Sequence, residues 1–160
     1  MKQFYTITAF TENEPGVLYR IADLFLRRKV NIESLTVSEI EEKGQARFTI
    51  VVYAEHDLVE KIVKQLYRII EVIKVIDSTD DDLVAREIAL IKVTAKDQKK
   101  REEIEHLVKL SECCLIIEVH SSYLVVEKTG HESEIDAFHT LLIPFGVKEF
   151  VQSGRIAVFR

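Results

Sequence analysis

Hydrophobic positions along the chain switch several times between the period of two that is typical of strands and the wider spacing of an amphipathic helix. Between Phe4 and Phe10 the residues alternate between two faces, which predicts a strand. From Gly16 to Phe25 the apolar residues recur at helical spacing, and the basic run 27–29 follows where cations suit the C-terminal end of a helix. The chain therefore opens with a strand that feeds directly into a helix.

The rest of the first half continues this pattern with strands expected at 31–40, 47–53 and 72–76. A second helix is expected to begin at Asp57, which can cap it with Glu60 three residues on. Its inward residues are expected to be Leu58, Ile62, Leu66 and Ile69, with Val59, Val63 and Ile70 beside them.

The second half repeats the same order of elements without repeating the residues. Strands are expected at 87–95, 113–119, 123–127 and 147–151, helices at 99–110 and 131–143, and residues 156–159 are a candidate for a further short strand. The inward helical residues are expected to be Ile104, Leu107, Val108, Ile135, Phe138, Leu141 and Leu142.

Two successive βαββαβ patterns predict an α+β protein of two tandem ferredoxin-like domains, each an antiparallel sheet with helices on one face. The expected limits are 1–78 for the first domain, 79–83 for a polar linker rich in aspartate, and 84–160 for the second domain.

The stretch TENEPGVL, residues 11–18, lies where the first strand meets the first helix. The first turn of a helix leaves backbone N–H groups unpaired, and these can bind an anion. Gly16 lets a ligand approach the backbone closely, and Pro15 fixes the chain before the helix. Asn31 opens the second expected strand, which is expected to lie near the same end of the domain as Asn13. With amides from Asn13 and Asn31, such a helix start suits the carboxylate and ammonium of a free amino acid. From the residues alone, an ordinary helix start remains the alternative.

A family resemblance favours the ligand site. ENEPGVL at 12–18 resembles the ligand loop of ACT domains, which are small amino-acid-binding regulatory modules. Together with NIESLTV at 31–37, it resembles the small regulatory subunit of acetohydroxyacid synthase, also called acetolactate synthase. Residues 84–93, 135–138 and 144–149 are also similar to that family, so the resemblance covers essentially the whole chain.

The resemblance implies a regulatory subunit with no catalytic residues and no cofactor of its own. It implies that the chain binds the large catalytic subunit, activates it and confers feedback inhibition by valine in branched-chain amino-acid biosynthesis. Thiamine diphosphate, Mg and FAD are expected on the catalytic subunit. Valine is expected between two N-terminal domains of a homodimer, and the site residues carried over are Asn13, Gly16, Val17, Leu18, Asn31 and Ile32.

Two other classes of function stay open at this stage. The chain could be a free-standing ACT-type amino-acid sensor that regulates another protein, or a small enzyme on a ferredoxin-like fold. No phosphate-binding or dinucleotide-binding glycine motif supports an enzyme. The choice among valine, leucine and isoleucine also stays open, because all three share the carboxylate and ammonium.

Composition narrows the remaining classes. The net charge of −5 over 160 residues argues against nucleic acid as a partner, and no apolar run is long enough for a membrane span. Adjacent Cys113 and Cys114 with no signal-peptide pattern favour a reducing, cytoplasmic location. The five histidines show no zinc-site spacing, so no metal site is expected, although His106 could meet the two cysteines in space.

Overall fold

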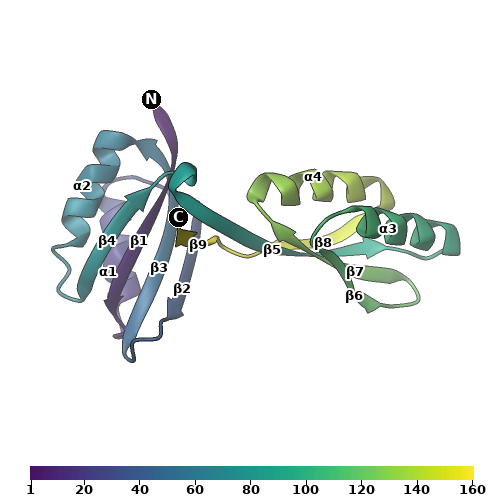
Figure 1. Ribbon diagram of the computed structural model, residues 1–160, viewed down its shortest axis with the longest axis horizontal. Coiled ribbons are helices and arrows are strands. Elements are labelled where there is room, and N and C mark those ends of the chain that lie inside the picture. The colour runs from purple at the N-terminus through teal and green to yellow at the C-terminus, as the bar shows by residue number, and fades with distance from the viewer. The chain divides into compact units, whose positions relative to one another are not determined.

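The computed structural model describes residues 1–160, which divide into two compact units (Figure 1). The first unit contains Met1–Ala85 and Arg155–Arg160, and the second contains Arg86–Gly154. The chain therefore crosses between the units twice, once within strand β5 (Leu83–Thr94) and once after Gly154. Of the residues expected to form a linker, Asp80–Asp82 form a 3-10 helix and Leu83 begins β5.

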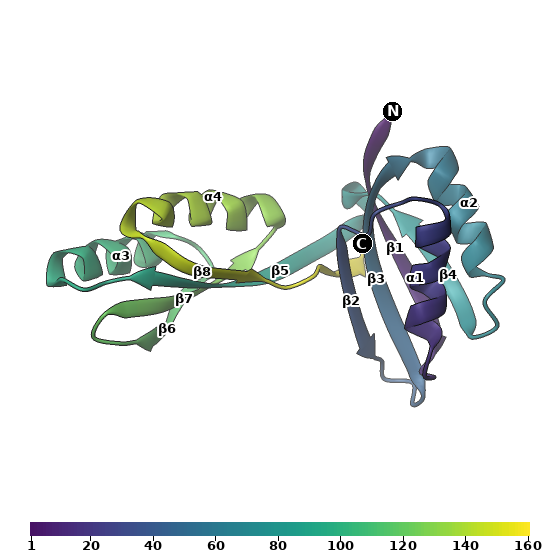
Figure 2. The same cartoon turned by 180° about the vertical axis from the view of Figure 1, so that it is seen from behind.

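The first unit contains a four-stranded antiparallel sheet with the strand order β2-β3-β1-β4. Its elements are β1 (Lys2–Glu12), α1 (Val17–Arg27), β2 (Ser34–Glu39), β3 (Gln45–Glu55), α2 (His56–Leu66) and β4 (Val72–Ser78). Figure 2 shows α1 and α2 in front of this sheet, on one face, with β9 (Ile156–Phe159) behind it. The predicted βαββαβ order and ferredoxin-like fold are confirmed.

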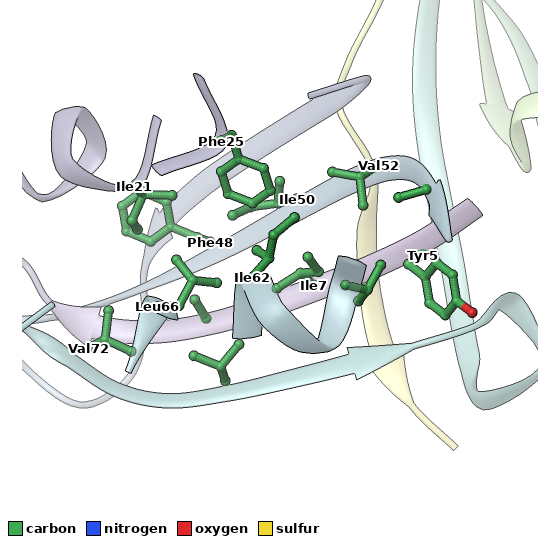
Figure 3. Close-up of a cluster of buried hydrophobic side chains, with 14 of the residues drawn as sticks. Tyr5, Ile7, Ile21, Phe25, Phe48, Ile50, Val52, Ile62, Leu66 and Val72 are labelled. Carbon is green, nitrogen blue, oxygen red and sulfur yellow. The ribbon is translucent and has the colours of Figure 1, made fainter. Parts of the chain in front are cut away.

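The core of the first unit lies between the sheet and its two helices (Figure 3). Alternate residues of β1 and β3 point into it, which is the consequence of the period of two seen in the sequence. The residues that fill this core and expose less than 2% of their surface include Ile7, Ile21, Phe25, Ile50, Val52, Ile62 and Leu66.

The opposite face of the same sheet is rich in threonine and is also covered. Thr6, Thr8 and Thr49 are almost fully buried there. The chain returns from the second unit at Arg155 and lays β9 over this face, where β9 pairs with the start of β5. Leu83, Ala85 and Ala157 form a small apolar cluster of their own.

The second unit repeats the fold with the strand order β6-β7-β5-β8. Beyond β5, its elements are α3 (Gln98–Leu110), β6 (Cys114–Val119), β7 (Tyr123–Gly130), α4 (Glu132–Leu142), the 3-10 helix Ile143–Phe145 and β8 (Val147–Gln152). Its core is built chiefly from aliphatic residues, including Ile91, Val93, Ile104, Leu124, Val126, Ile135 and Leu142.

Several predicted details are wrong at the ends of elements. The N-cap of α2 is Glu55 and not Asp57, and no side chain bonds to the first turn. The same helix ends at Leu66, so Ile70 is 93% exposed in the turn that follows. Leu141 is also half exposed, because α4 places Phe138 and Leu142 on its inner face.

Candidate functional site

The loop between β1 and α1 is held by its backbone at two points. The amide of Glu12 donates to the carbonyl oxygen of Glu71 at 2.8 Å, and the amide of Asn13 donates to that of Gly44 at 2.8 Å. Gly44 belongs to the hairpin that joins β2 to β3. The loop is therefore anchored to the residue directly before β4 and to the β2–β3 hairpin, while the side chain of Asn13 stays exposed.

Gly16 forms the start of α1 in a left-handed conformation, with φ of +92°. This region favours glycine because a Cβ atom is strained there. The helix has no side-chain cap and no acidic residue in its first turn. The amides of Leu18 and Tyr19 donate to no atom of the chain, and that of Val17 makes only a long bond of 3.4 Å to Glu14. Donors of this kind can bind a carboxylate.

The two apolar residues at the helix start have different surroundings. Val17 exposes only 2% of its surface and packs in the core, so only its backbone can face a ligand at the loop. Leu18 is 47% exposed beside the free amides. Leu18 is therefore the side chain at this helix start that can contact an aliphatic ligand.

Asn31 and Ile32 precede β2 and do not belong to it, contrary to the expected strand limits. The amide group of Asn31 donates to Glu33 Oε1 at 3.0 Å, and both residues are exposed. Ile32 is half-buried against the core of the first unit.

The two predicted halves of the site lie at opposite ends of the sheet. Ser34, the first residue of β2, lies opposite Val51, which lies opposite Thr6. Glu12, at the other end of β1, is six residues further along, or about 20 Å in a strand. The expectation that Asn31 lies near the same end of the domain as Asn13 is therefore wrong for a single chain.

Arg20 and Glu71 form a brace beside the loop that sequence reasoning missed. Arg20 Nη1 is paired with Glu71 Oε1, and Arg20 Nη2 would lie 4.0 Å from a Cβ atom added to Gly16. The hydrogen bond from Glu71's own amide, followed by that from Arg20, lowers the pKa of the Glu71 carboxyl. The sequence could have indicated Arg20, because this residue lies one helical turn after Gly16 and therefore on the same side of the helix.

A groove of about 420 Å³ lies between α1 and α2 and does not include the predicted site residues. It is lined by Arg20, Asp23, Leu24, Arg27, Arg28, Gln65, Arg68 and Ile69. Arg28 donates to Gln65 at 3.0 Å, which brings the C-terminal ends of the two helices side by side. Cations are expected there, because the last carbonyl groups of each helix carry partial negative charge.

The chain shows no cluster of three or more His, Cys, Asp or Glu side chains that could hold a metal ion, and Cys113 and Cys114 are free thiols. None of its helices combines the length and the apolar character that a membrane crossing needs.

Both halves of the chain match family models. Residues 7–74 match the ACT domain of the acetohydroxyacid synthase small-subunit type, and residues 86–160 match the small subunit of acetolactate synthase. The chain is also 43% identical over 156 residues to the acetolactate synthase small subunit of Mycobacterium bovis, covering 98% of this chain and 92% of that protein. The chain belongs to the acetolactate synthase small-subunit family.

Other members of the family agree over the full length. The probable acetolactate synthase small subunit of Archaeoglobus fulgidus is 41% identical, with 98% of this chain and 96% of that protein covered. The crystal structure of the acetolactate synthase small subunit from Thermotoga maritima superposes with a TM-score of 0.89 at 36% identity, covering 99% of this chain and 98% of that chain. This small subunit is therefore a regulatory subunit, and its family implies a catalytic large subunit as partner.

Proposed function

We propose that this small subunit activates the large catalytic subunit of acetolactate synthase and makes it sensitive to feedback inhibition by valine. It carries out no reaction itself, and thiamine diphosphate, Mg and FAD belong to the large subunit. The complex acts in the cytoplasm, in branched-chain amino-acid biosynthesis. The observation that supports the proposal is the uncapped start of α1, where Gly16 is followed, after Val17, by two exposed residues whose amides donate to no atom of the chain.

The separation of Asn13 from Asn31 supports a site shared by two chains. Strand β2 is at the edge of its sheet, so its outer backbone groups can pair with another strand. If two β2 strands pair antiparallel about a two-fold axis, the start of one lies beside the end of the other. Asn31 precedes that start, and the loop at Asn13 is bonded to the hairpin after that end. Dimerisation would therefore bring Asn31 of one chain to the loop of the other.

The chemistry of the shared site fits an aliphatic amino acid. The amides of Leu18 and Tyr19 would donate hydrogen bonds to the carboxylate, and the side-chain oxygens of Asn13 and Asn31 would accept hydrogen bonds from the ammonium. Leu18 and Ile32 would contact the branched side chain, while Gly16 and Val17 would contribute backbone only. The full set is Asn13, Gly16, Val17, Leu18, Asn31 and Ile32.

Regulation follows from the shared site. A ligand held by two chains binds the paired arrangement better than separate chains, so valine would favour that arrangement. The coupling is reciprocal and typically amounts to about 1–3 kcal/mol.

Calorimetric titration of the chain with valine, and acetolactate formation by the reconstituted complex, test the proposal together. We expect saturable valine binding at about one site per chain, as two-fold symmetry requires. Gly16→Asp should abolish binding and inhibition, because its carboxylate would repel that of valine, while activation of the large subunit persists.

Gly146→Asp is a matched control, because Gly146 has φ of +90° but lies in the second unit. It should keep valine binding despite similar backbone strain. Valine inhibition that survives Gly16→Asp would disprove the assigned site. A chain that neither binds nor activates the large subunit would favour a free-standing sensor. Titrations with leucine and isoleucine under the same conditions rank the three amino acids by affinity.

A further inference from the structure

The segment Arg155–Arg160 is bound to the threonine-rich face of the first sheet by a buried cation. The Arg155 side chain is 3% exposed, and its Nη1 donates to Asp80 Oδ1 at 2.6 Å and to Thr6 Oγ1 at 3.1 Å. These three residues are far apart in the sequence. A buried guanidinium that loses one of its partners is costly, so this segment is held by a strong and specific contact.

A second bond ties the same residue to the start of β2. The backbone amide of Arg155 donates to Ser34 Oγ at 3.0 Å. Ser34 begins β2 and lies three residues after Asn31, in the part of the chain proposed to bind valine. Anything that fixes the chain at Asn31 and Ile32 therefore also restrains the acceptor of the Arg155 amide.

The rest of the segment is held by Arg47 from β3. Arg47 Nη2 donates to the Ala157 carbonyl at 2.5 Å, and its guanidinium lies near the rings of Phe10 and Phe159, at 5.6 Å and 5.7 Å from their centroids. Beyond it, the amide of Arg160 donates to the Asp82 carbonyl at 3.1 Å. Figures 1 and 2 both show β9 on the sheet face opposite α1 and α2.

The covered face is not fully satisfied. Thr8 Oγ1, Thr36 Oγ1 and Arg47 Nε are buried without a hydrogen-bond partner. Each buried unpaired polar atom carries a cost that hydration would relieve. Release of the segment from the sheet would break the Arg155 bonds but would hydrate these unpaired atoms. The free-energy difference between the docked and released states is therefore smaller than the Arg155 bonds alone would make it.

We propose that Arg155 is a positioning residue that transmits effector occupancy from the start of β2 to the point where the chain returns from the second unit. This inference rests on the proposed function and states how occupancy of the proposed valine site would affect the rest of the chain. Effector binding at Asn31 and Ile32 orders Ser34. Ser34 in turn holds Arg155, the residue directly after Gly154, where the second unit ends. Valine thereby favours the docked segment.

The test combines amide hydrogen exchange of residues 155–160 with valine inhibition of the reconstituted complex. In the wild-type chain, valine should slow exchange in this segment by about fivefold or more, the lower end of typical coupling. Ser34→Ala and Asp80→Asn should weaken valine binding by no more than this same coupling factor, because the coupling is reciprocal, yet at saturating valine they should lose most of this protection and most of the inhibition. A merely structural role would not separate binding from inhibition in this way.

Two neighbouring residues of the same types provide matched controls. Ser38→Ala changes an exposed serine of the same strand. Asp81→Asn changes the aspartate next to Asp80, and Asp81 makes no bond to Arg155. Both should behave as the wild type. Melting curves of all four variants check that each one folds.

The outcomes separate the two ideas. A wild-type chain that binds no valine contradicts the proposed function, and this inference falls with it. Valine binding that leaves exchange at 155–160 unchanged, or full inhibition in both Ser34→Ala and Asp80→Asn, overturns this inference alone.

Discussion

At the scale of single residues, two threonines on one face of β1 have opposite roles. Thr6 and Thr8 are both buried, but only Thr6 has a partner, the guanidinium of Arg155. Valine has nearly the same shape without the hydroxyl. Thr8→Val should therefore stabilise the protein by about 1 kcal/mol, because it removes a buried unpaired group. Urea unfolding at neutral pH measures the change.

Thr6→Val is the matched comparison. It removes an acceptor from a buried cation and should destabilise the protein by about 1–2 kcal/mol. Equal effects of the two substitutions would mean that the hydroxyl of Thr8 is hydrated or paired in solution.

The residues of the candidate site show what a sequence can and cannot predict at this scale. Gly16 is predicted as the helix start because glycine before an apolar helical pattern is a local signal. In the structure Gly16 is the N-cap of α1, in a left-handed conformation. The burial of Val17 and the exposure of Leu18 were not predicted, because both lie within the same apolar pattern. Arg155 gave no signal, since its partners lie 75 to 149 positions away.

At the scale of elements, the brace between α1 and the start of β4 predicts a dependence on pH. The pKa of Glu71 is lowered in the folded protein by its own amide and then by Arg20. A lowered folded-state pKa contributes stability above the usual value near 4.5, and this stability is lost as the pH falls below it. Unfolding free energies of the wild type and Glu71→Gln should therefore differ most at neutral pH and converge in acid.

Glu14→Gln, in the exposed loop before α1, controls for the change in net charge. It removes one negative charge without touching the pair of Arg20 and Glu71, so an effect seen only in Glu71→Gln belongs to that pair. A wild-type curve parallel to that of Glu71→Gln from pH 7 to pH 3 would show that the brace contributes nothing in solution.

The existence of each helix and strand could be predicted, because period-two and helical spacings are properties of neighbouring residues. Their ends could not. The apolar spacing of α2 continues through Ile69 and Ile70, but the chain turns after Leu66, where the Tyr67 hydroxyl bonds to both the amide and the carbonyl of Val75. A contact with a distant strand therefore determines where α2 ends, and the local sequence pattern does not predict such a contact.

At the scale of the whole molecule, the directions of the strands determine whether one chain can form the candidate site alone. Both β1 and β2 run antiparallel to β3, so they are parallel to each other, and β2 begins at the end where β1 begins. The loop at Asn13 follows the far end of β1. This consequence of topology was available from the predicted order of elements. It implies that one chain alone presents two half-sites and that a second chain must complete each of them.

Mixing two inactive variants tests that conclusion directly. Gly16→Asp destroys the loop half and Asn31→His the other half, so each homodimer should bind no valine. In a mixed dimer, one site receives both substitutions and the other receives neither. Random exchange of chains makes half of the dimers mixed, so calorimetry should recover about a quarter of the wild-type sites. If each site lay within one chain, every chain in the mixture would carry a damaged site and no binding would return. The recovered stoichiometry therefore distinguishes a site shared between chains from one contained in a single chain, with the wild type alone and each variant alone as the limits of the measurement.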